Sequence, residues 1–106
     1  MIKLYHATAS ADDAFQIEEE GFKGNDVWHY ENVVFLADRP LPGFGGWREA
    51  WIEVAIPSAF LGQGKYDEAD LDAEIYHAQC YCFTAELINQ FPRKVFVDRV
   101  PGFDFE

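Results

Sequence analysis

Apolar and polar residues alternate along several parts of the chain, as they do in half-buried strands. Alternation of this kind runs from Ile2 to His6 and from Trp51 to Ile56. The run from Asn32 to Ala37 is apolar on both faces, which is typical of a central strand. Two further strands are predicted at 75–83 and 94–98. Most of the predicted regular structure is therefore a sheet.

Two short helices are predicted between these strands. Ser10 stands three residues before Asp13, which resembles a capping box, and the helix that follows is expected to stop at Gly21. Thr84 precedes Ala85–Ile88 as the cap of a second helix, and 58–61 is a third short turn. Because strands outnumber helices, the pattern predicts an α+β fold with a mixed, mostly antiparallel sheet and two or three short helices.

Length and composition indicate one domain over residues 1–106. The chain is 49% hydrophobic and 17% aromatic, which is enough for a core of its own. No apolar run approaches the roughly 18 residues that span a bilayer, and the first residues lack a secretory signal. We therefore expect a cytoplasmic protein without a membrane partner. Cys80 and Cys82 are spaced to share one strand face, and we expect reduced thiols.

The formal charge of −11 would repel a phosphate backbone, so no nucleic-acid partner is expected. An acidic surface of this kind is either solvated or docks a basic protein. The Gly- and Pro-rich stretch 40–46 predicts an exposed loop that carries Phe44 and Trp47 near its end. These two side chains are expected either to lie over a ligand or to fold back onto the core.

Two motifs carry a resemblance to a known family. The segment Leu4-Tyr5-His6-Ala7-Thr8, followed by a helix that ends in Gly21-Phe22, resembles the opening of ADP-ribosyltransferases and of the related RNA 2′-phosphotransferases. Residues 33–40 resemble their second motif, in which an aromatic-containing strand forms a wall of the nicotinamide pocket. Residues 51–57 and 81–89 are similar to the closing strands and helix of small bacterial or phage members.

The resemblance implies a split sheet of the ADP-ribosyltransferase type, with NAD bound as a substrate in the cleft between two sheet edges. It implies that His6 donates a hydrogen bond to a ribose hydroxyl and that the backbone at Ala7 and Thr8 holds the nicotinamide amide. Phe35 would form the stacking wall, and Trp47 would cover the ligand. The implied function is binding of NAD or an ADP-ribose-like nucleotide, with transfer of ADP-ribose to a target protein.

One part of the family pattern is missing. Relatives carry a Glu before the closing helix, where its charge stabilises the oxocarbenium-like transition state. Here Cys80 occupies that position, or Gln79 if the register slips by one, and neither is an acid. Glu53, Glu68 and Glu74 are alternative acids. Activity is therefore left open, and the alternative is a catalytically inactive acidic binding module or inhibitor that engages a basic protein.

Other chemistry has less support in the sequence. His77 and Cys80, three residues apart on one strand, would point to opposite faces, which does not suit a thiol nucleophile with its base. His29-Tyr30-Glu31 is interpreted as a loop. The cysteines and His77 lack the paired spacing of a zinc site, so no metal site is expected.

Overall fold

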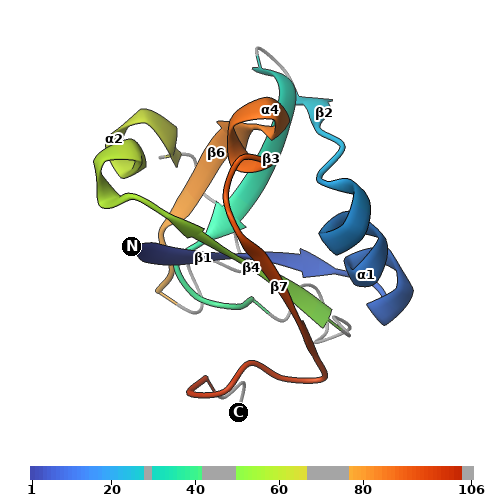
Figure 1. Ribbon diagram of the computed structural model, residues 1–106. Coiled ribbons are helices and arrows are strands. Elements are labelled where there is room, and N and C mark those ends of the chain that lie inside the picture. Colours follow the sequence, from blue (N-terminus) through green and yellow to red (C-terminus); the bar gives the residue numbers. More distant parts are fainter. Residues whose placement is uncertain (28–29, 42–49, 67–76, 104–106) are drawn as a thin grey trace.

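The computed structural model describes residues 1–27, 30–41, 50–66 and 77–103. The strands are β1 (Ile2–Thr8), β2 (Asn25–Val27), β3 (Tyr30–Ala37), β4 (Ala50–Ile56), β5 (Lys65–Tyr66), β6 (Cys80–Thr84) and β7 (Arg93–Val97). The helices are α1 (Ala11–Glu20), α2 (Leu61–Gly64) and α4 (Ala85–Ile88), with a 3-10 turn η2 (Ser58–Phe60) (Figure 1). The predicted α+β class is confirmed. Within the described ranges, no helix is long and apolar enough to cross a membrane.

The strands form one sheet in the order β5-β6-β3-β1-β4-β7, and β2 pairs with β3. Every strand pairing among the described residues is antiparallel, which confirms the mostly antiparallel sheet. In Figure 1 the strands β1, β4 and β7 run together, while β3 and β6 cross them steeply. We call the first group the lower unit and the group of β2, β3, β5 and β6 the upper unit.

Strand pairing joins the two units at one position. Strand β1 pairs with β4 at seven positions, from Ile2 opposite Ile56 to Thr8 opposite Ala50. By contrast, β1 and β3 are opposed only at Tyr5 and Ala37. The sheet is therefore continuous within each unit and opens between them, on the side of β1 that follows Tyr5.

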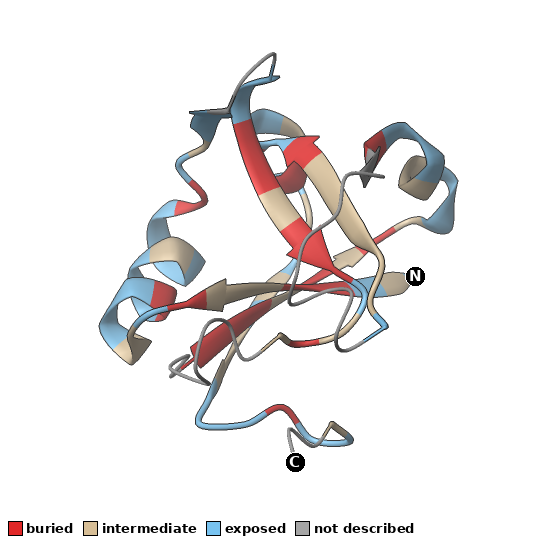
Figure 2. Ribbon diagram, turned by 180° about the vertical axis from the view of Figure 1, so that it is seen from behind, coloured by how far each residue is buried: buried red, intermediate tan, exposed pale blue. Residues whose placement is uncertain are grey.

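Side chains on the two faces of the lower unit enter different clusters. Alternate residues of β1 point to opposite faces, so Leu4 enters the main core beneath α1 and α4, whereas Tyr5 enters a smaller cluster with Trp51 and Val100. Figure 2 shows buried residues gathered on the strands, while α1 is largely exposed on its outer side. The main core holds α1 through Ala14, which is fully buried.

Local signals fix both ends of α1. The Ser10 hydroxyl accepts a hydrogen bond from the Asp13 N–H at 3.1 Å, so the predicted cap is present. Gly21 ends the helix at φ 90°, in a region that side chains rarely adopt. Near this end, the Glu18 carboxylate accepts a hydrogen bond from the Val95 N–H on the outermost strand β7 at 3.1 Å.

Some element boundaries differ from those predicted. Strand β1 continues to Thr8 because the buried Thr8 hydroxyl donates to the Ala50 carbonyl at 3.0 Å and extends the pairing with β4. Strand β6 begins at Cys80, after His77 has turned the backbone with a φ of 56°. After the turn η2 come α2 and the two-residue strand β5, neither of which was predicted.

Candidate functional site

A cavity of about 420 Å³ lies where β1 and β3 separate. Its volume is within the range of about 300 to 1,000 Å³ that is common for small-molecule sites. Four segments line it: the end of β1 (His6, Ala7, Thr8, Ala9), one side of α1 (Asp13, Gln16, Ile17), the connection to β2 (Gly21, Phe22, Lys23, Asn25) and the middle of β3 (Val33, Val34, Phe35). The cavity is thus bounded by both units, with β1 on one side and β3 on the other.

His6 connects the two units inside this cavity. Its Nδ1 lies 2.8 Å from the Phe35 carbonyl oxygen, and its ring packs edge-on against Phe22 with centroids 5.3 Å apart and planes at 89°. Because a carbonyl oxygen only accepts, Nδ1 carries the proton. In the neutral ring Nε2 is then an acceptor, and in the charged ring it is a donor. The fold therefore fixes both the position and the tautomer of this imidazole.

Thr8 and Ala7 offer the cavity mainly their backbone. The Thr8 hydroxyl lies within hydrogen-bonding distance of two carbonyl oxygens, those of Ala50 at 3.0 Å and Ser10 at 3.1 Å. It thereby holds β1 to β4 and fixes the turn into α1. Ala7 points to the opposite face, where it packs against the Tyr5 cluster. Within the described residues, no strand pairs with this stretch of β1 on the β3 side.

The connection from α1 to β2 is held from two sides. On one side, the Asn89 carboxamide accepts from the Phe22 N–H at 2.6 Å and donates to the Phe22 carbonyl at 3.0 Å. On the other side, a Cβ at Gly24 would lie 2.3 Å from the Asn32 carbonyl carbon, so the backbones touch there. The wall of the cavity that carries Phe22 and Lys23 is therefore firmly placed. The role of Asn89 could not be recognised from the sequence, because both of its side-chain bonds are to Phe22, which is 67 residues away in the chain.

The residues predicted at the missing acid position lie elsewhere. Gln79 lines a separate hollow of about 380 Å³ with Leu61, Gly62 and Tyr81. Its side chain donates to the Cys80 carbonyl at 2.8 Å. Cys80 is opposite Ala37 on the far side of β3, about 10 Å or two strand spacings from β1. Phe35, in contrast, lines the cavity. Trp47 lies outside the described residues.

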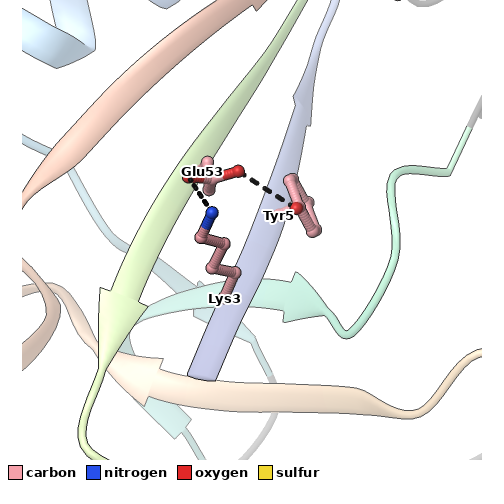
Figure 3. Close-up of polar contacts among 3 residues, drawn as sticks. All are labelled: Lys3, Tyr5 and Glu53. Atoms are coloured by element: carbon pink, nitrogen blue, oxygen red, sulfur yellow. Dashed lines mark hydrogen bonds and ion pairs between the residues drawn. The ribbon is translucent and has the colours of Figure 1, made fainter. Parts of the chain in front are cut away.

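Of the alternative acids, Glu53 is excluded by its position. The Tyr5 hydroxyl donates to Glu53 Oε2 at 3.0 Å, and Lys3 Nζ lies 3.8 Å from Glu53 Oε1 (Figure 3). Since Tyr5 and His6 are neighbours on one strand, Glu53 lies on the face opposite His6. Glu68 and Glu74 fall outside the described residues. Asp13 is the one carboxylate among the described residues that line the cavity.

Burial raises the pKa of several titratable groups outside the cavity, among them Tyr5, Tyr81 and Cys82. Burial raises the pKa of Tyr5 from its ordinary value of 10.0 to about 12, and the hydrogen bond to Glu53 and its negative charge act in the same direction. Burial also raises the pKa of the Cys82 thiol. Cys80 and Cys82 form no disulfide. The raised pKa of Cys82 disfavours its thiolate, and His77 lies outside β6, the strand that carries both cysteines.

Metal ligands do not cluster in the part of the chain that the structure describes, where no three His, Cys, Asp or Glu side chains come together. Comparisons of the chain with known protein families, curated proteins and solved structures find no match. The geometry of the cavity is therefore the basis for assigning a function.

Proposed function

We propose that the cavity between β1, β3 and α1 binds NAD or an ADP-ribose-like nucleotide, and that the domain is ADP-ribosyltransferase-like. The observation that carries the proposal is the opening of the sheet at the two motifs that resemble that family. His6 and Phe35 are 29 residues apart, yet both line the cavity and are joined by a hydrogen bond. Antiparallel strands ordinarily close such a gap with a continuous ladder.

The lining suits the parts of a nicotinamide nucleotide. The lining residues Ile17, Phe22 and Val34 provide apolar surface for a flat ring, and the backbone at Ala7 and Thr8 would hold a carboxamide. The ring of His6, whose Nδ1 bonds to the Phe35 carbonyl, lines the cavity, where the family motif would place it beside a ribose hydroxyl. Lys23 is the one cationic side chain among the described lining residues, and it supplies the charge that phosphates need in a chain of net charge −11.

Transfer of ADP-ribose would require one further group. The bond between the ribose carbon and the nicotinamide nitrogen breaks, nicotinamide leaves with the electron pair, and positive charge develops on the ribose. A nucleophilic group of the target protein then bonds to this carbon and gives up its proton to solvent. A carboxylate beside that carbon stabilises the charge. Gln79 and Cys80 lie outside the cavity and are not acids, whereas Asp13 lines it. Nucleotide binding therefore requires the cavity alone, whereas transfer of ADP-ribose would also depend on the carboxylate of Asp13.

Calorimetric titration and thermal shift with NAD, ADP-ribose and nicotinamide test the proposal. A ligand at 100 times its Kd stabilises the folded state by about 2.7 kcal/mol. We expect His6→Ala to abolish binding while changing the melting temperature of the free protein little. The matched control is His77→Ala, because His77 is exposed and lies outside the cavity. If the wild-type protein binds none of these ligands at millimolar concentration, the proposal that the cavity binds a nucleotide is wrong.

A second candidate function is an acidic module that engages a basic protein. The observation that favours it is the acidic last turn of α1. Glu18, Glu19 and Glu20 occupy the last turn without a basic residue, where the helix dipole disfavours negative charge. Phe15 nearby is 50% exposed. If no nucleotide binds, this candidate takes first place, and its partner affinity should fall with ionic strength because exposed charges are screened.

A further inference from the structure

Helix α4 lies behind the connection that forms one wall of the cavity, and Asn89 follows directly after it. Asn89 is the C-terminal cap of α4, where its backbone N–H donates to the Ala85 carbonyl at 2.9 Å. Its backbone carbonyl accepts from the Arg93 guanidinium at 3.1 Å. These backbone contacts place the residue without using its side chain, which is left to act on another part of the chain.

The Asn89 side chain binds Phe22 as a neighbouring strand would. Its Oδ1 accepts from the Phe22 N–H at 2.6 Å, and its Nδ2 donates to the Phe22 carbonyl at 3.0 Å. One carboxamide thus satisfies both polar groups of a half-buried peptide segment, which would be costly to leave unpaired. Only a side chain with both a donor and an acceptor on one planar group can make this pair of bonds.

The preceding glycine makes this close approach possible. A Cβ at Gly21 would lie 3.1 Å from Asn89 Cγ and Oδ1, and its φ of 90° already disfavours a side chain. The backbone at Gly21 therefore packs closely against the Asn89 carboxamide. Fixing the backbone of Phe22 also fixes where its ring meets His6, 5.3 Å away and edge-on.

We infer that Asn89 is a positioning residue for the cavity, although it does not line it. The contacts form a chain from the Asn89 carboxamide to the Phe22 backbone, from the Phe22 ring to His6, and from His6 to the Phe35 carbonyl on the other unit. Asn89 thereby sets the orientation of the imidazole at the junction of the two units. The part of the inference that concerns ligand affinity rests on the proposed function; the part that concerns His6 does not.

Nuclear magnetic resonance of the histidine rings tests the inference without any ligand. The chain has three histidines, so their ring signals are few and can be assigned with His→Ala variants. The ring current of Phe22 acts on His6 at this distance. We expect Asn89→Ala to move the His6 signals and to leave those of His77 in place. A folded Asn89→Ala protein with unchanged His6 signals would overturn the inference.

Two further variants separate positioning from general stability. Asn89→Asp keeps the acceptor for the Phe22 N–H but loses the donor to the Phe22 carbonyl, so a partial shift of the His6 signals is expected. It also serves as the test if Asn89→Ala fails to fold. Gln90→Ala is the control, because within the described part of the chain the Gln90 side chain donates to the Glu86 carbonyl in α4 at 3.4 Å and makes no hydrogen bond to Phe22. It should leave every histidine signal unchanged.

Ligand affinity gives the second readout. At a temperature where all variants are folded, we expect Asn89→Ala to weaken ADP-ribose binding by about tenfold, as loss of positioning hydrogen bonds does, with Asn89→Asp intermediate and Gln90→Ala unchanged. Unaltered affinity in Asn89→Ala, with wild-type binding present, would overturn the inference. If the wild type binds none of the nucleotides, the proposed function fails, and the histidine signals still decide whether Asn89 positions His6.

Discussion

The two edges of β1 are paired very differently, although the same seven residues form both. Toward β4, all seven are opposed by a partner, and the side chains from this pairing that point into the main core, such as Leu4 and Ile52, are fully buried. Toward β3, one pair is formed at Tyr5 and Ala37, and a cavity of about 420 Å³ follows. We call these the closed edge and the open edge.

Under the proposed function, one strand would serve stability with its closed edge and binding with its open edge. A strand that is fully paired on one edge has little freedom, so the groups on its other edge are held at fixed positions. His6 illustrates this, because its backbone is opposite Ile52 on the closed edge while its ring spans the open edge to Phe35. Stability and binding should therefore respond to different substitutions along β1.

The largest effect should come from breaking the core beneath the closed edge. Leu4→Ala removes a fully buried side chain and leaves a cavity, which should lower the free energy of unfolding by about 2–5 kcal/mol in urea denaturation. Lys3→Ala is the control, since the Lys3 side chain is 63% exposed and its ion pair at 3.8 Å adds little. A loss below about 1 kcal/mol for Leu4→Ala would mean that the core repacks around β1.

An intermediate effect should come from the wall of the open edge. Gly21→Ala forces a side chain into a φ of 90° and against Asn89, which should cost about 1–3 kcal/mol of unfolding free energy and weaken nucleotide binding as well. Gly62→Ala provides the matched control. Its Cβ would meet nothing within 4 Å and it lies in α2, so a gain of about 0.5–1 kcal/mol is expected. Equal effects of both substitutions would contradict the strain at Gly21.

The smallest effect should come from the polar contact on the face of the closed edge opposite His6. Tyr5→Phe removes the donor to Glu53 and should cost about 1 kcal/mol at neutral pH. The pKa of Tyr5 rises from 10.0 to about 12 on folding, so its contribution is complete below pH 10 and is lost as the pH rises through about 12. Urea denaturation over this pH range should show a steeper loss for the wild type than for Tyr5→Phe. Parallel losses would place the titration elsewhere.

Features that depend on nearby residues could be predicted from the sequence. The Ser10 and Thr84 caps are present as expected, because each is set by hydrogen bonds over three residues. The strands at 32–37 and 51–56 were recognisable because their patterns reflect burial on one or both faces. Boundaries shifted where a tertiary contact extended an element, as the Thr8 hydroxyl does for β1.

Features that depend on distant pairing could not be predicted in this way. Nothing in the pattern shows that β1 and β3 meet at one pair of residues, because register depends on how whole strands dock. The structure places His6, Ala7, Thr8 and Phe35 on one cavity, and their binding roles stay predictions. Gln79 and Cys80 were aligned to a family position, yet the neighbouring strand β3 separates Cys80 from β1.

The bond between Glu18 and Val95 also affects how molecules of this protein behave toward one another. Strand β7 is the last strand of the sheet on its side, and an uncovered edge invites pairing with a second chain. The Glu18 carboxylate occupies the Val95 N–H near the middle of that edge and brings negative charge to it. A strand from another molecule would have to displace this carboxylate before it could add to the sheet. Crowded molecules should therefore resist stacking edge to edge into larger aggregates.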